Sequence, residues 1–279
     1  MTNPTETHAD MELFFAEKGF SQKTEEQYRG ILRVFLAKVD VETCTPTELL
    51  DFLRSSGWGN SRQYVACVII RQYIKWKLGD THPILRVRVK REKPRPGRTL
   101  SENQILHLLT SFDLNTSKGC RDFAIANLAL DTGLRVNEIA SIKMRDLNLE
   151  TREILVRVKG GRWERAFFSP FTEEALKRWI QLRNPHDERV FQVTRDGLGV
   201  IVRRWGEKIG IKLSPHDFRR TFAVMAIKAG APTRLVQVAG RWSDIRMVEY
   251  YTRTIDAIDL GPYFPMAHLQ KKLTLPARQ

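Results

Sequence analysis

The sequence predicts a mainly α-helical protein with a small β-sheet, in which an N-terminal all-helical domain precedes a C-terminal mixed α/β domain. Three observations predict this class. Apolar residues recur at helical spacing along the N-terminal part, a basic segment with prolines follows, and one alternating hairpin pattern interrupts a second helical stretch. We therefore expect a helical domain at 1–85, a basic linker at 86–100 and the second domain, with a C-terminal tail, at 101–279.

The N-terminal domain is predicted to contain four helices. Its clearest signal is the i, i+3, i+4, i+7 repeat of apolar residues between Ser21 and Val39. Thr45, followed by a proline and then by Glu48, has the pattern of a capped helix start. Two further helices are expected, a long one at 60–77 and a short leading one at 11–17.

The second domain is predicted to begin with a capping box, in which Ser101 precedes Gln104 by three residues. The alternating stretch from Glu153 to Val158 predicts a strand that turns at Gly160-Gly161 and returns from Trp163 to Phe168. The remaining periodicity predicts helices at 102–111, 118–131, 135–142, 172–183, 198–209, 215–229, 232–239 and 244–251.

The charge balance favours a polyanionic partner. The 279 residues include 46 Lys and Arg against 32 Asp and Glu, a net charge of +14, which promotes binding to nucleic acid through counterion release. Apolar runs fall short of the ~20 residues that a membrane helix needs, and the polar N-terminus does not resemble a signal peptide. With three separated cysteines and no CxxC motif, we expect a cytoplasmic protein without disulfides or a zinc site.

The basic segment between the domains is the first candidate for a DNA contact. Residues 85–98 hold seven basic residues, one acidic residue, two prolines and a glycine, which predicts an extended, solvated linker. The functional interpretation adds that the linker follows a DNA backbone. The side chains expected to do so are those of Arg86, Arg88, Lys90, Arg91, Lys93 and Arg95.

Two separated segments are candidates for a phosphate site. Ser214 and the proline after it predict a helix start that carries His216 and Arg219, and a helix N-terminus favours an anion. Arg135 follows a glycine where one helix ends and another begins, and its guanidinium could fork onto two phosphate oxygens. The alternatives are a solvated polar helix face for the first pair and a surface ion pair with Glu138 for Arg135.

The order of these motifs carries a family resemblance. Arg135 lies in the pattern TGLRxxE, Lys159 follows at the end of the first hairpin strand, and HxxR, GRWSD and a tyrosine nine residues after the tryptophan come later. Alone, Lys159 reads as an ordinary exposed lysine. Together the motifs resemble the tyrosine recombinase family (phage integrase-like and Xer-like site-specific recombinases). The resemblance implies a core-binding helical domain and a mixed α/β catalytic domain.

The resemblance also implies a role for each motif. Two arginines would clamp the scissile phosphate, the histidine would assist proton transfer, the hairpin lysine would protonate the leaving 5′-oxygen, and the tryptophan would donate a hydrogen bond. The tyrosine would form a 3′-phosphotyrosine and free a 5′-hydroxyl, so that strands rejoin without ATP, metal or cofactor. The catalytic residues so implied are Arg135, Lys159, His216, Arg219, Trp242 and Tyr251.

Two tyrosines compete for the role of nucleophile, and helical periodicity does not separate them. The spacing from Trp242 and the following Thr252-Arg253 favour Tyr251, with Tyr250 as a packed neighbour. The sequence departs from the family pattern twice. Arg220 stands where many members have a second histidine, and Trp242 stands where most have histidine, so proton transfer rests more on the lysine and on the histidine of HxxR.

The resemblance implies duplex DNA as partner, with four protomers on two DNA sites and a Holliday junction between them. The tail from about Leu260 to Leu275 is expected to dock on a neighbouring protomer. Two rival functions share part of the pattern: a type IB topoisomerase, and a catalytically silent DNA-binding protein of the same fold. A metal nuclease is disfavoured, because no cluster of carboxylates lies near the His-Arg segment.

Overall fold

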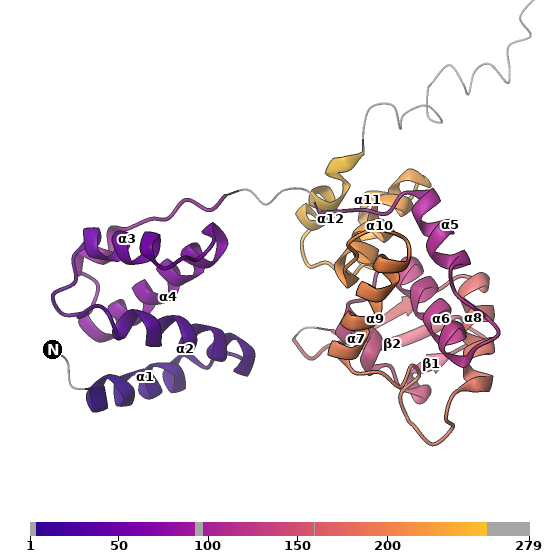
Figure 1. Ribbon diagram of the computed structural model, residues 1–279, viewed down its shortest axis with the longest axis horizontal. Helices are drawn as coiled ribbons and strands as arrows, with labels where there is room; N and C mark the ends of the chain where they lie inside the picture. The colour runs from indigo at the N-terminus through magenta and orange to yellow at the C-terminus, as the bar shows by residue number, and fades with distance from the viewer. Residues whose placement is uncertain (1–3, 93–96, 159, 256–279) are drawn as a thin grey trace, which may run out of the picture. The chain divides into compact units, whose positions relative to one another are not determined.

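A computed structural model of the chain describes residues 4–92, 97–158 and 160–255. The chain divides into two compact units, residues 1–94 and 95–279, each with its own hydrophobic core (Figure 1). The predicted fold class is confirmed, since both units are mainly helical and one small sheet lies in the second. Some predicted features lie outside the described residues, namely Lys93, Arg95, Lys159 and the tail from Leu260 to Leu275.

The first unit is an all-helical bundle around its fourth helix. Helix α4 contacts each of the other three helices, and its Tyr73 is fully buried against Phe14 of α1, with ring centroids 5.4 Å apart. The predicted capping box forms, because Glu48 accepts the backbone N–H of Thr45 at 2.7 Å and donates its own to the threonine hydroxyl at 3.2 Å. The helices are α1 (Pro4–Lys18), α2 (Gln22–Leu36), α3 (Pro46–Ser55) and α4 (Asn60–Leu78), followed by the 3-10 helix η1 (Pro83–Arg86).

Residues 86–92 of the predicted linker pack onto this first unit and are not a free solvated strand, whereas Leu100 at its other end is buried in the core of the second unit. Val87 is buried in the core of the first unit. The side chain of Asn60, at the start of α4, donates to the carbonyl of Lys90 at 3.0 Å and accepts from the backbone N–H of Glu92 at 2.8 Å. The segment differs from the predicted solvated strand because apolar residues alternate with its basic ones, and burying these apolar side chains lowers the free energy of the folded unit.

The second unit is built around α6, most of whose side chains are buried. Helix α6 contacts α8 and α10, while α11 and α12 pack on α10 (Figure 1). The helices of this unit are α5 (Glu102–Thr110), α6 (Ser117–Thr132), α7 (Val136–Ser141), α8 (Pro170–Leu182), α9 (Arg195–Lys208), α10 (Pro215–Lys228), α11 (Thr233–Ala239) and α12 (Arg246–Tyr251), with short 3-10 turns η2 (Met144–Asp146) and η3 (Thr252–Thr254).

The sheet has three antiparallel strands in the order β1-β2-β3. Strands β2 (Glu153–Arg157) and β3 (Trp163–Phe167) form the predicted hairpin, in which Arg157 lies opposite Trp163. Alternate residues such as Ile154 and Ala166 are buried, so one face of the hairpin covers the core. Strand β1 (Leu147–Asn148) was not predicted, because two residues are too short to show alternation.

Candidate active site

Arg219 of α10 joins two helix ends in the second unit, those of α6 and α11. Its Nη1 donates to the carbonyl of Gly133, at the end of α6, and its Nη2 donates to the carbonyl of Gly240, at the end of α11, both at 2.5 Å. The side chain is only 1% exposed, so the solvated helix face considered from the sequence is wrong for this arginine. Burial and the charges of Arg135 and Arg241 lower the pKa of Arg219 to about 10, which leaves it protonated at neutral pH.

Gly133 holds the end of α6 in the geometry that this contact requires. Its φ is +58°, in the left-handed region, and a Cβ there would lie 2.5 Å from the ring of Phe222. Glycine is therefore required on both conformational and steric grounds. The sequence correctly predicts the helix end at this glycine but not that its carbonyl accepts from an arginine far along the chain.

Tyr251 lies at the opposite side of the same site and contacts His216. The tyrosine Oη is 3.1 Å from Nε2 of the histidine, and the tyrosine side chain is 4% exposed. The histidine ring keeps one side open to solvent, and its pKa is lowered by burial of the rest and by the charges of Arg220 and Arg219. A neutral imidazole is thus favoured, and its Nε2 can accept the tyrosine hydroxyl proton.

The neighbouring Tyr250 occupies a different environment. Its ring packs against that of Tyr251 with centroids 5.7 Å apart, and the guanidinium of Arg253 lies 5.1 Å from its ring centre. The hydroxyl of Tyr251 contacts His216, and the ring of Tyr251 also meets that of Trp242, with centroids 5.5 Å apart. The geometry therefore favours the same tyrosine as the sequence spacing.

Arg135 approaches the site from the start of α7. Its Nη1 donates to Glu138 at 2.7 Å, and its backbone N–H donates to the other carboxylate oxygen at 2.8 Å. The ion pair that the sequence offered as an alternative is thus present, yet 40% of the arginine side chain remains exposed. The buried carboxylate fixes one side of the guanidinium, and the other donors stay accessible to a phosphate.

Trp242 lies between the arginine and the tyrosine. The guanidinium of Arg219 is 4.3 Å from the centre of its ring, and the ring of Phe222 stacks on it with centroids 6.2 Å apart. Its indole Nε1 is buried and has no hydrogen-bond partner among the described residues. An unsatisfied buried donor costs about 1–3 kcal/mol, so an acceptor oxygen of a ligand would stabilise this arrangement.

The structure thus gathers five of the six predicted catalytic residues, and the sixth, Lys159, is not described. The hairpin that carries it is closed by a 2.8 Å hydrogen bond from the N–H of Val158 to the carbonyl of Arg162. Arg241 is a partly buried site residue that the sequence analysis missed: it lies within the GRWSD motif, but only the tryptophan of that motif was given a role. Those brought together are Arg135, His216, Arg219, Trp242 and Tyr251.

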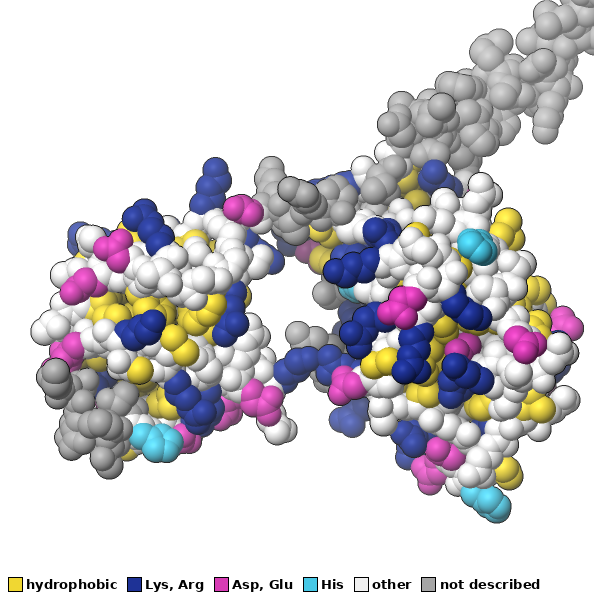
Figure 2. All heavy atoms as spheres, in the orientation of Figure 1, with side chains coloured by type: hydrophobic (Ala, Val, Ile, Leu, Met, Phe, Trp, Pro, Cys, Tyr) yellow, Lys and Arg dark blue, Asp and Glu magenta, His cyan; other side chains and the backbone are white. Residues whose placement is uncertain are grey.

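Four of the basic linker residues predicted to contact DNA lie among the described residues, and all four are exposed on the first unit: Arg86, Arg88, Lys90 and Arg91. Arg91 lies 5.7 Å from the ring centre of Tyr64, and nearby on α4 Arg62 lies 4.7 Å from that of Trp58. Figure 2 shows Lys and Arg side chains on the visible face of both units. Exposed cations over aromatic rings suit contact with a phosphate backbone.

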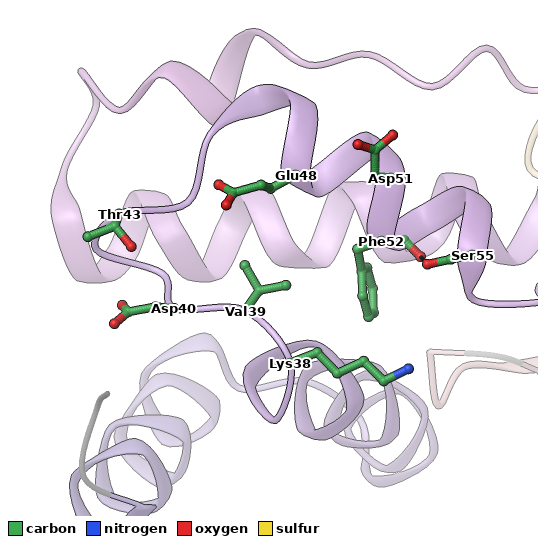
Figure 3. A pocket seen from close by; sticks show the side chains of 8 residues that line it. All are labelled: Lys38, Val39, Asp40, Thr43, Glu48, Asp51, Phe52 and Ser55. Atoms are coloured by element: carbon green, nitrogen blue, oxygen red, sulfur yellow. Dashed lines mark hydrogen bonds between the residues drawn. The ribbon is translucent and has the colours of Figure 1, made fainter.

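A hollow of about 420 Å³ in the first unit has the opposite character (Figure 3). Carboxylates of Asp40, Glu48 and Asp51 line it, and Glu48 is engaged in capping α3. Lys38 also lines the hollow, but the three carboxylates outweigh its charge and disfavour a phosphate. Over the described ranges, no three His, Cys, Asp or Glu side chains are grouped as metal ligands, and no helix has the length and hydropathy of a membrane span.

Comparisons with known proteins identify the family of the chain. Residues 98–257 match the phage integrase family. Tyrosine recombinase XerA of Saccharolobus solfataricus is 34% identical over 196 residues, covering 70% of this chain and 63% of that protein. Tyrosine recombinase XerC of Actinobacillus pleuropneumoniae is 27% identical over 280 residues, covering 92% and 91%.

Solved structures share the fold at lower identity. A lambda integrase (75–356) dimer bound to a COC′ core site has a TM-score of 0.75 at 14% identity, covering 92% of this chain and 97% of that one. The Tn1549 transposon integrase in complex with transposon right end DNA has a TM-score of 0.72 at 14% identity, covering 95% and 99%. With the family match extending over more than half of the sequence, the chain belongs to the phage integrase family and is a site-specific tyrosine recombinase, an enzyme that cleaves and rejoins DNA.

Proposed function

We propose that this recombinase cleaves duplex DNA by transferring a phosphodiester to Tyr251. The observation that carries the proposal is the 3.1 Å contact between the Oη of Tyr251 and Nε2 of His216, beside two arginines. The tyrosine oxygen forms the new bond to phosphorus, and the bond from phosphorus to the 5′-oxygen breaks. The products are a 3′-phosphotyrosine and a 5′-hydroxyl, and the reverse reaction rejoins a strand.

Proton transfer is divided between two groups. His216, held neutral by its surroundings, accepts the hydroxyl proton of Tyr251 as the oxygen attacks. The leaving 5′-oxygen needs a proton in turn. We assign that donor to Lys159 from its place in the motif order, between the TGLRxxE and HxxR motifs.

Charge stabilisation comes from the arginines and the indole. Arg135 and Arg219 would neutralise the charge that develops on the phosphate oxygens, and fixed charges in a buried site act more strongly than in water. The unpartnered Nε1 of Trp242 would donate to one of these oxygens. Because Arg219 and Tyr251 are both buried, neighbouring atoms have to move before a phosphodiester contacts them.

We propose further that the exposed cations fixed to the first unit, Arg86, Arg88, Lys90 and Arg91, contact the DNA backbone, as do Lys93 and Arg95 beyond them. The enzyme would work in the cytoplasm as a homo-oligomer, with four protomers on two DNA sites. The lambda integrase that shares the fold is a dimer bound to a core site, which supports assembly on DNA.

The nucleophile assignment can be tested with a nicked suicide substrate, on which cleavage traps the covalent adduct. Tyr251→Phe is expected to bind this DNA as tightly as wild type and to form no adduct, because the phenol oxygen is gone. Tyr250→Phe is the matched control and should retain adduct formation. An adduct with Tyr251→Phe, together with none from Tyr250→Phe, would show that the assignment is wrong.

A further inference from the structure

Arg241 joins the same two helix ends as Arg219, although it follows α11 in the chain and does not lie on α10. Its Nη2 donates to the carbonyl of Thr132 at 2.8 Å, and its Nη1 donates to the carbonyl of Ala239 at 2.6 Å. These carbonyls belong to the last turns of α6 and α11, where no intrahelical donor is available. A cation is also favoured there by the helix dipole.

The two arginines form a matched pair. Arg241 takes one carbonyl at each helix end, and Arg219 takes the next one along, those of Gly133 and Gly240. Both guanidinium groups therefore bridge the end of α6 and the end of α11, and they bind consecutive carbonyls at each end. At each helix end, the carbonyl that orients Arg219 is therefore adjacent in the chain to the carbonyl that Arg241 binds.

The conformation of Arg241 is not that of an ordinary surface arginine. Its φ is +56°, in the left-handed region that non-glycine residues seldom adopt. Its side chain is partly buried, and its Nε is buried without a hydrogen-bond partner among the described residues. Strain of this kind persists only where surrounding contacts impose it, and it concentrates at functional sites. The next residue in the chain is Trp242.

We infer that Arg241 is a positioning residue for strand cleavage, which acts by fixing the end of α6 to the end of α11 and thereby orienting Arg219 and the turn that leads to Arg135. The inference rests on the proposed function of the site. Arg241 itself touches no reacting atom. Loss of the Arg241 side chain should slow the chemical step at saturating DNA and change the affinity for DNA little, because Arg135 and Arg219 would remain present but misplaced.

The test compares three substitutions by single-turnover adduct formation, DNA affinity and thermal unfolding. In Arg241→Gln the shorter amide can reach at most one of the two carbonyls, and we expect cleavage to slow by about 10- to 100-fold, the loss that misplacement near 1 Å causes. Arg241→Gly removes the guanidinium but relieves the left-handed backbone, so it should fold well and still lose cleavage. Arg241→Lys keeps a charged donor and should recover part of the rate.

Arg178→Gln is the matched control. Arg178 also donates to a backbone carbonyl, that of Leu114 at 2.7 Å, but from the exposed surface of α8, so its loss should leave cleavage unchanged. Wild-type cleavage rates in a folded Arg241→Gly would overturn the inference, as would losses of rate that only follow equal losses of affinity or melting temperature. If wild type itself forms no adduct, the proposed function fails instead.

Discussion

The contact between Gly240 and Trp242 provides a sharp test of how the site is assembled. A Cβ at position 240 would lie 1.8 Å from Cζ3 of the indole and 2.2 Å from its Cε3. The backbone there has a φ of −81°, which alanine adopts freely. Gly240→Ala therefore perturbs the position of the indole and introduces no backbone strain.

The size of the effect follows from this geometry. Carbon atoms in ordinary contact are about 3.5 Å or more apart, so the indole would have to move by roughly 1.5–2 Å. Overpacking of this kind lowers the free energy of unfolding by about 1–3 kcal/mol. The shift also displaces the Nε1 donor and the ring on which Arg219 lies, 4.3 Å away, so cleavage should slow by about 10- to 100-fold.

Thermal unfolding and single-turnover cleavage at saturating DNA measure the two effects. At about 2–4 °C per kcal/mol for a unit of this size, Gly240→Ala should melt several degrees below wild type. Gly199→Ala is the control, because nothing lies within 4 Å of its Cβ in the middle of α9 and alanine is the better helix former there. If Gly240→Ala melts and cleaves like wild type, the indole is not held against this glycine and the reasoning fails.

Two further predictions concern pH and DNA affinity. Because the pKa of His216 is lowered, the cleavage rate should fall with decreasing pH only below about pH 6.5, where the protonated ring no longer accepts the proton of Tyr251. His216→Asn should abolish this fall in rate at acidic pH. An unchanged pH profile in the variant would contradict the role of His216 as proton acceptor. In the same window the unfolded chain binds the proton more tightly than the folded one, so this residue's contribution to stability is present above about pH 6.5 and is lost as pH falls through the lowered pKa. Asn60→Ala removes the hydrogen bonds that hold the backbone of Lys90 and Glu92. It should weaken DNA binding by about threefold or more, because the basic segment is no longer preorganised, and should not slow cleavage at saturating DNA. Equal DNA affinities of the variant and the wild type would show that this segment does not contribute to DNA binding.

The helices and the hairpin were predictable because their signals are local. Ser101 and Gln104 form the reciprocal bonds of a capping box, as do Thr45 and Glu48. The observed hairpin follows the alternating residues on both sides of Gly160-Gly161. Helix α1 begins at Pro4, well before the predicted start, since its first turns are polar and show no periodicity.

The assembly of the site was predictable only through the resemblance, because its contacts are distant in sequence. The carbonyl of Gly133 lies 86 residues from Arg219, and Tyr251 lies 35 residues from His216. Periodicity alone placed His216 and Arg219 together on a polar face, yet one is exposed and the other buried. The acceptors are backbone carbonyls, which every residue carries, and no side-chain pattern distinguishes them.

Arg241 shows why such a residue escapes a sequence analysis. A left-handed position after a helix normally contains glycine or asparagine, so an arginine there gives no turn signal. Two helix C-termini brought together inside a protein leave carbonyls that cost free energy unless donors reach them. Arg219 and Arg241 supply those donors, and each brings a positive charge that a neutral donor would lack. The interactions that satisfy the helix ends therefore also create the cationic site to which a phosphate is attracted, and a local conflict with backbone preference is expected where structure and chemistry share residues.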